Sequence, residues 1–216
     1  MTVPELQIDP IDTSNYLKHT HSNPIQRRLI ERFHQVIAAK VLETAPDSFL
    51  DAGCGEGFVS RYLLERSPGL DIAGFDWNPD CVAVAQATNP TESYLVADVT
   101  RLPFADNAFD VAGCFEVLEH LHEPQRALRE LVRVSRSAVI LSVPHEPYFC
   151  LSNVARGKNL DIRPRGSDPD HRQFWSRQAF REFVEQEATI TWIGGSFPWT
   201  ICVAEPRRQD GQTASR

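Results

Sequence analysis

Strand-like and helix-like segments alternate along most of this chain, and this alternation restricts its fold more than any other feature. Apolar runs of strand length occupy residues 47–51, 70–76, 93–97, 109–115 and 138–143. Helical patterns occupy residues 24–42, 57–66, 79–88, 123–134 and 176–186, and two last strands are expected at 189–196 and 199–205. The alternation predicts an α/β fold with a doubly wound, mostly parallel sheet and ligands at the carboxyl ends of its strands.

The loop after the first strand, FLDAGCGEG, carries the strongest functional signal, because Gly53, Gly55 and Gly57 closely follow Asp51. Glycine lets a backbone turn sharply and approach a ligand, at which the next helix aims its amide groups. A dinucleotide site needs G-x-G-x-x-G, but here the third glycine comes one residue early. Asp51 would repel a pyrophosphate and would suit a ligand with an ammonium or sulfonium group. A glycine-rich turn without a ligand is the alternative.

Carboxylates also follow the second and third strands. Asp76 can accept hydrogen bonds from ribose hydroxyls, and Trp77 beside it can lie against an adenine ring. Asp98 can accept from an adenine amino group, and the amide of Val99 can donate to a ring nitrogen. The alternatives are a favourable acid at a helix start for Asp76, packing for Trp77 and a local turn for Asp98.

Four segments in this order, FLDAGCGEG, GFDWNP, VADVTRLPFADNAFD and EVLEHL, resemble the small-molecule branch of the class I S-adenosylmethionine (SAM) dependent methyltransferases. The resemblance covers about residues 47–145 and is closest to the ubiquinone/menaquinone-methylase-like group. It implies SAM as the cofactor. It also implies a Rossmann-like sheet of about seven strands in the order 3-2-1-4-5-7-6, with the last strand antiparallel and helices on both faces.

The same resemblance assigns roles to individual positions. It places Asp51 and the loop of residues 53–57, which includes Cys54, against the methionine part of SAM. Asp76 would hold the ribose, with Trp77 beside it, and Asp98 and Val99 would recognise adenine. Phe115 and Glu116 follow the fourth strand and would lie near the methionine part and the mouth of the acceptor site.

Candidate catalytic residues follow the fifth strand. His145 is the first candidate for a general base, because an unperturbed histidine titrates near neutral pH. Tyr148 could orient an acceptor, and His171 is a second candidate base. The alternatives are a loop histidine bonded to backbone for His145 and a polar partner that fixes the cap for His171.

We expect one domain over residues 1–206, followed by a polar tail at 207–216. A lid at about residues 10–42 would bring Tyr16, His19 and His21 over the cofactor. A long, irregular connection at about residues 145–175 would form a cap, since long loops in compact domains are usually functional or disordered.

No metal site is expected. His19-x-His21 and His120-x-His122 have spacings that could suit a metal, but two histidines at that spacing are weak evidence for a metal site. The expectation is therefore that Glu119 and His120 complete a strand-to-helix turn.

The composition of the chain limits the kinds of binding partner and the cellular location that we expect. The net charge of −7, with only short basic clusters, argues against nucleic acid. No apolar run is long enough for a membrane span, the first residues lack a secretory signal, and five cysteines without a C-x-x-C pair are expected to be reduced. A cytoplasmic location follows.

The function expected from the sequence is therefore transfer of a methyl group from SAM to an oxygen, nitrogen or carbon atom of a small-molecule acceptor. The segment CFEVLEHL lacks the N-P-P-Y-like tetrapeptide of DNA amino-methylation. A SAM-binding module without turnover and a protein methyltransferase stay as alternatives, and the glycine spacing disfavours a nicotinamide oxidoreductase. The sequence points to neither an acceptor nor an oligomeric state.

Overall fold

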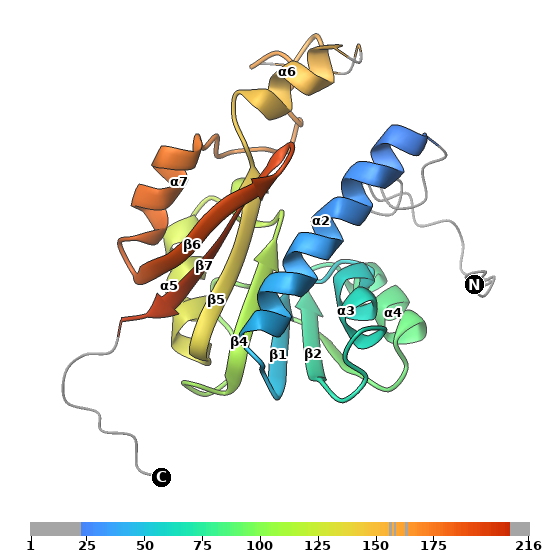
Figure 1. The fold of residues 1–216 in the computed structure, drawn as a ribbon, viewed down its shortest axis with the longest axis vertical. Helices are drawn as coiled ribbons and strands as arrows, with labels where there is room; N and C mark the ends of the chain where they lie inside the picture. Colours follow the sequence, from blue (N-terminus) through green and yellow to red (C-terminus); the bar gives the residue numbers. More distant parts are fainter. Residues whose placement is uncertain (1–22, 156, 158, 163, 208–216) are drawn as a thin grey trace.

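The computed structural model describes residues 23–207 apart from 156, 158 and 163, and its centre is a seven-stranded sheet (Figure 1). The strands are β1 (Ser48–Ala52), β2 (Asp71–Asp76), β3 (Ser93–Val96), β4 (Phe109–Phe115), β5 (Ser135–Pro144), β6 (Ala188–Ser196) and β7 (Trp199–Pro206). Their order is β3-β2-β1-β4-β5-β7-β6, and β7 runs antiparallel to β5 and β6 on either side of it, whereas the other neighbouring strands are parallel. The predicted fold class and strand order are confirmed.

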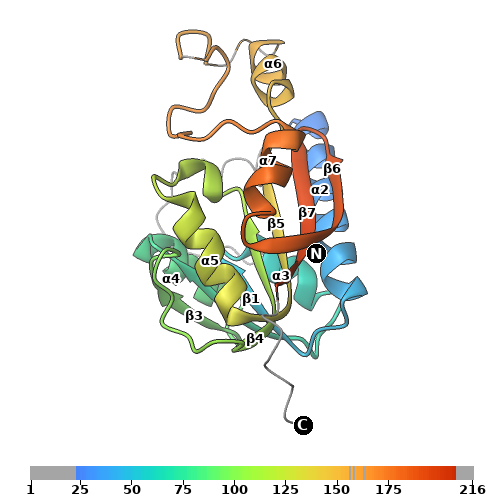
Figure 2. The same cartoon turned by 90° about the vertical axis from the view of Figure 1, so that its left-hand side faces the viewer.

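Helices cover both faces of this sheet, and two buried apolar layers hold them there. α2 (Pro24–Glu43) and α3 (Phe58–Leu64) pack on one face, and α4 (Pro79–Thr88) contacts β2 and β3. α5 (Pro124–Val134) and α7 (Arg177–Val184) pack on the opposite face and lie toward the viewer in Figure 2. Each fully buried large apolar side chain in these layers contributes about 1.5–3 kcal/mol.

Side-chain caps explain where several helices begin. Asn23 accepts a hydrogen bond from the backbone nitrogen of Ile25 at 2.9 Å and starts α2. Asn78 accepts from Asp80 at 3.0 Å and starts α4, and the Ser176 hydroxyl accepts from Ala179 at 3.2 Å and starts α7. Caps of this kind contribute about 1 kcal/mol each. Asparagine and serine are among the residues most favoured at the N-cap position.

One expectation was wrong: the connection at residues 145–175 is not irregular throughout, because α6 (Tyr148–Ala155) lies within it. Phe149 and Cys150 are buried, whereas Leu151 beside them is exposed. The apolar residues of α6 therefore do not form the single buried stripe by which a helix is recognised in a sequence. Asn153 is buried and donates a hydrogen bond to the carbonyl of Gly166 at 2.7 Å. Tertiary contacts of this kind stabilise α6, and periodicity does not reveal them.

Two further expectations concern residues at the two ends of the chain. The proposed lid residues Tyr16, His19 and His21, and residues 208–216 of the polar tail, lie outside the described residues. Among the helices of residues 23–207 that the structure describes, none is long and apolar enough to cross a bilayer.

Candidate functional site

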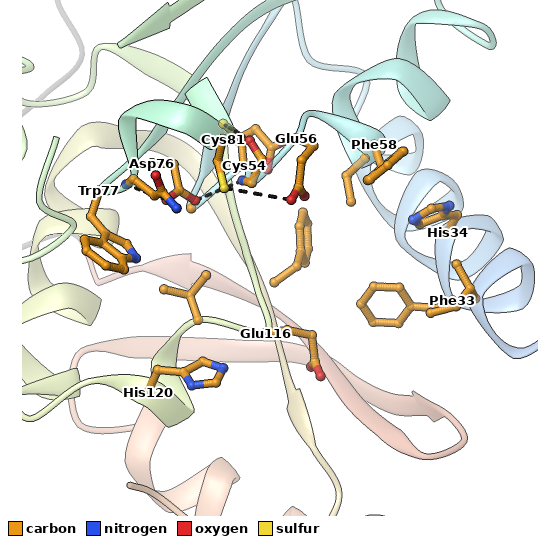
Figure 3. Close-up of a pocket in the computed structure, with 18 of the residues that line it drawn as sticks. Phe33, His34, Cys54, Glu56, Phe58, Asp76, Trp77, Cys81, Glu116 and His120 are labelled. Carbon is orange, nitrogen blue, oxygen red and sulfur yellow. Dashed lines mark hydrogen bonds between the residues drawn. The ribbon is translucent and has the colours of Figure 1, made fainter. Parts of the chain in front are cut away.

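A cavity of about 340 Å³ opens beyond the carboxyl ends of β1, β2 and β4 (Figure 3). The strand order reverses between β1 and β4, because β2 and β3 are added on one side of β1 and β4 on the other, and such switch points are where open α/β sheets bind ligands. The loop after β1 forms one wall, and α2 together with the start of β7 forms another. The predicted site residues that line the cavity are Asp51, Gly53, Cys54, Gly55, Asp76, Trp77, Phe115 and Glu116.

The glycine loop is held tightly against β2. The backbone nitrogens of Gly53 and Cys54 both donate to the carbonyl of Phe75, at 2.8 and 2.9 Å. Gly53, Gly55 and Gly57 all have left-handed φ angles, of 74°, 52° and 78°. Gly57 precedes α3 and is not among the lining residues, whereas Gly53 and Gly55 present their backbone to the cavity. The glycines are needed here because only they adopt this path without strain.

Gly53→Ala tests this requirement. A Cβ at Gly53 would lie 2.4 Å from Cγ2 of Val117, and the φ of 74° disfavours any side chain. We expect a loss of roughly 1–3 kcal/mol in the free energy of unfolding, measured by urea denaturation. Gly69→Ala is the matched control, because a Cβ added there would have no atom within 4 Å and its φ is not left-handed. Equal denaturation midpoints for the two variants would contradict the account of the loop.

Asp76 joins the glycine loop to the end of β2. One carboxylate oxygen accepts from the backbone nitrogen of Gly55 at 2.9 Å, and the other accepts from Asn78 at 2.9 Å. Burial raises the pKa of Asp76, although these two hydrogen bonds act in the opposite direction. Each carboxylate oxygen has a further lone pair, so Asp76 can also accept from hydroxyl groups of a ligand. Trp77 lines the cavity beside it and is 79% exposed.

Asp51 lies deeper, at the end of β1, and is only 2% exposed. The hydroxyl of Ser60 donates to its carboxylate at 2.6 Å. Burial, with the nearby charge of Asp76 acting in the same direction, raises the pKa of Asp51 to about 6, although the hydrogen bonds from Ser60 lower it. A cationic group in the cavity would compensate this buried carboxylate.

The opposite wall is mainly aromatic, and sequence reasoning missed most of it. Phe33 and His34 point into the cavity from α2 (Figure 3). The ring centroids of Phe33 and Trp199 lie 4.7 Å apart. The sequence signal for Phe33 was the apolar stripe of the first helix, which does not show that part of that stripe faces a cavity. Phe115 and Glu116 close the cavity at the end of β4. Glu116 has a φ of 59° and accepts from the hydroxyl of Ser142 at 3.1 Å.

The structure does not bring Asp98 and Val99 into the cavity wall. One carboxylate oxygen of Asp98 accepts from both the backbone nitrogen and the hydroxyl of Thr100, at 2.8 Å each, which is the local turn that the sequence left as an alternative. Val99 is buried in the apolar core. Asp98 still follows β3 at the same edge of the sheet, so a role with adenine stays a prediction.

Two of the predicted catalytic residues also lie outside the cavity wall. The backbone nitrogen of His145 donates to the carbonyl of Pro198 at 2.9 Å, and its ring centroid lies 5.0 Å from that of Tyr148. Burial lowers the pKa of His145, with the charge of Arg177 acting in the same direction. Tyr148 is 51% exposed on α6. Their catalytic roles stay predictions.

His171, the third candidate, is not among the lining residues either, but its ring contacts one of them. Its ring centroid is 4.9 Å from that of His120, which lines the cavity and belongs to the short 3₁₀ helix η1 (Leu118–His120). Glu119, His120 and His171 form a compact cluster, although sequence reasoning gave Glu119 and His120 only a turn-completing role. His171 is too far away in sequence for spacing alone to reveal the cluster.

Known proteins match this chain over its central part. Residues 50–143 match the model of a methyltransferase domain. A demethylmenaquinone methyltransferase of Renibacterium salmoninarum is 30% identical over 169 residues, covering 75% of this chain and 70% of that protein. A malonyl-[acyl-carrier protein] O-methyltransferase of Pseudescherichia vulneris is 36% identical over 101 residues, covering 47% of this chain and 39% of that protein. The chain thus spans less than half of the second relative.

A solved structure shares the architecture. Magnesium protoporphyrin IX methyltransferase from Synechocystis, with bound S-adenosylhomocysteine (SAH), superposes with a TM-score of 0.64 at 19% identity. The superposition covers 86% of this chain and 88% of that one. At this identity the likeness shows the fold.

Proposed function

Because the chain belongs to the class I SAM-dependent methyltransferases, whose cofactor is SAM, we propose that it transfers a methyl group to a small-molecule acceptor. The acceptor atom would be oxygen, nitrogen or carbon. The observation that carries the proposal is the cavity at the β1–β4 switch point, where the glycine loop, Asp51 and Asp76 meet.

In this proposal the cofactor lies along the wall formed by β1 and β2. The ribose hydroxyls would donate to Asp76, and the adenine would extend toward Trp77 and the ends of β2 and β3. The methionine end, with its ammonium and sulfonium charges, would lie near Asp51 and the backbone of Gly53. The support is electrostatic, because a buried carboxylate whose pKa is raised by desolvation is stabilised by a cation beside it.

The acceptor would enter between the sulfonium methyl group and the aromatic wall of Phe33, Phe115 and Trp199. Methyl transfer is an in-line displacement, so the protein's main task is to place a nucleophile opposite the carbon–sulfur bond. The sulfonium charge disappears as the methyl group leaves, and an apolar wall that excludes water favours this change. An acceptor with a hydroxyl or ammonium group must also lose a proton, for which His145 and His171 are the proposed bases, and Tyr148 would orient the acceptor.

The proposal extends to partners and location. The two relatives act, by their names, on demethylmenaquinone and on malonyl-[acyl-carrier protein], which favours an acceptor other than nucleic acid. The net charge of −7 supports the same choice. All five cysteines are free and buried, which supports a reducing, cytoplasmic location.

Calorimetric titration with SAM and SAH, next to a turnover assay over a panel of acceptors, tests this proposal. We expect both ligands to bind at one site per chain and turnover with at least one acceptor. Binding of both ligands without turnover of any small molecule would favour the alternatives, which are a SAM-binding module or a protein methyltransferase. Failure of both ligands to bind would contradict the proposal itself.

A further inference from the structure

A cluster of metal-ligand side chains lies beside the cavity and is not used by the cofactor in the proposed function. It consists of Glu119 and His120 from η1 and His171 from the segment that follows α6. One donor atom from each side chain lies within 4.8 Å of the others. Glu119 is only 1% exposed, whereas both imidazoles are partly accessible. Because His120 also lines the cavity, the cluster adjoins the space proposed for the acceptor.

Backbone hydrogen bonds hold the two halves of the cluster together. The backbone nitrogens of Arg172 and Gln173 both donate to the carbonyl of Glu119, at 2.7 and 3.0 Å. The side chain of Gln173 donates to the carbonyl of Leu121 at 3.1 Å. His171 therefore sits next to residues that are fixed to η1. A preorganised ligand set of this kind loses little conformational entropy when it binds an ion.

The orientation of His120 suits a metal ligand. Its Nδ1 lies 3.2 Å from the carbonyl oxygen of Asp170, which can only accept, so Nδ1 carries the hydrogen. The lone pair is then on Nε2, and metal-binding histidines commonly have their other ring nitrogen bonded to a carbonyl in this way. The ring centroid of Phe149 lies 5.3 Å from that of His171, so an apolar side chain borders the cluster.

The donor set selects a class of ion. Two imidazole nitrogens and one carboxylate match sites of Zn²⁺ and related first-row ions, whereas Mg²⁺ and Ca²⁺ prefer oxygen ligands throughout. Three protein ligands also leave at least one coordination position for water or a substrate oxygen. Within the part of the chain that the structure describes, this is the one group of its kind.

We propose that Glu119, His120 and His171 bind a divalent first-row transition-metal ion, which presents an open coordination position to the acceptor region of the cavity. This proposal departs from the expectation of no metal site that the sequence spacing gave. With the ion bound, His171 serves as its ligand, and His145 is then the candidate base. Binding of the ion does not depend on the proposed function.

The role of the ion in catalysis does rest on the proposed function. The ion would bind a hydroxyl oxygen of the acceptor and lower its pKa, so that the proton passes to water. The oxygen would then form its bond to the methyl carbon as the carbon–sulfur bond of SAM breaks. The products are the methyl ether or ester, neutral SAH and one released proton.

Metal binding is tested on the full chain, stripped with a chelator and titrated with Zn²⁺ in the absence of SAM. A Co²⁺ titration, followed by visible absorption, reports on the ligands. We expect one ion per chain, and His171→Ala should weaken Zn²⁺ binding by roughly 100-fold or more, since even outer partners of metal ligands contribute about 10–100-fold. Glu119→Gln, which keeps the shape of the side chain, should weaken it similarly. His122→Ala is the matched control, because His122 is exposed and lies outside the cluster.

Thermal unfolding and SAM titration of each variant separate loss of the metal from loss of the fold. Substoichiometric Zn²⁺ binding, or equal affinity in His171→Ala and His122→Ala, would overturn the proposal and leave the cluster as a polar link between η1 and the cap. If the ion binds but chelated and metal-loaded protein methylate hydroxyl acceptors at the same rate, the catalytic role is wrong. If Zn²⁺ binds and SAM does not, the proposed function fails while the metal site stands.

Discussion

Asp76→Ala is expected to weaken SAM binding by roughly 5- to 150-fold, which corresponds to about 1–3 kcal/mol. The substitution would remove the proposed acceptor of the ribose hydroxyls. It would also release the backbone nitrogens of Gly55 and Asn78, which the carboxylate holds at 2.9 Å each. The dissociation constant from calorimetric titration is the measurement.

Asp71→Ala provides the matched control for this variant. Asp71 begins the same strand at its opposite end and is exposed, so its removal should leave SAM affinity unchanged. Equal affinities for the two variants would remove Asp76 from the binding site. Thermal unfolding with and without SAH would separate a loss of ligand contacts from a loosened glycine loop, because only the latter lowers the melting temperature of the free protein.

Asp51→Asn should have two opposite effects, a more stable free protein and weaker SAM binding. Burial raises the pKa of Asp51 from 3.8 to about 6, so ionising it near pH 7.5 costs the folded state about 3 kcal/mol. Asparagine keeps an oxygen that can accept from Ser60 and carries no charge. We therefore expect a gain of up to about 3 kcal/mol in the free energy of unfolding above pH 7. The missing charge should weaken attraction for the cationic end of SAM.

The pH dependence of stability in wild type and in Asp51→Asn shows whether the ionised Asp51 destabilises the folded protein. Between pH 4 and 6 the folded wild type binds more protons at Asp51 than the unfolded chain does, so its stability should fall as pH rises through this window. SAM affinity should change in the other direction and rise as Asp51 ionises. Denaturant midpoints and titrations from pH 4.5 to about 8 measure both quantities. If the stability of Asp51→Asn changed with pH in parallel with that of wild type, the raised pKa assigned to Asp51 would be contradicted. The control is Asp80→Asn, a substitution on the surface.

Much of the fold could be predicted because local patterns and tertiary structure agree. The strand-length apolar runs alternate with helical patterns, and two of these helices begin at residues suited to capping, Asn78 and Ser176. The glycine spacing after the first strand agrees with the same doubly wound sheet. Asp51 and Asp76 could be placed at the cavity because residues after parallel strands share one edge of a sheet.

The rest depended on contacts between segments distant in sequence. α6 is held partly by the bond between Asn153 and Gly166, and a period of apolar residues does not report such a bond. Asp98 follows its strand as expected, but the hydroxyl and amide of Thr100 take up one of its oxygens. The approach of His171 to Glu119 depends on how the cap folds back over η1, which sequence spacing cannot show.

A crystal structure of the full chain with SAH tests the central claim most directly. We predict that the nucleoside lies in the cavity at the β1–β4 switch point, with its ribose hydroxyls within hydrogen-bond distance of the Asp76 carboxylate. Its amino-acid end should lie toward Asp51 and the backbone of Gly53. Stoichiometric SAH bound elsewhere on the molecule, with the glycine loop facing solvent alone, would contradict the account.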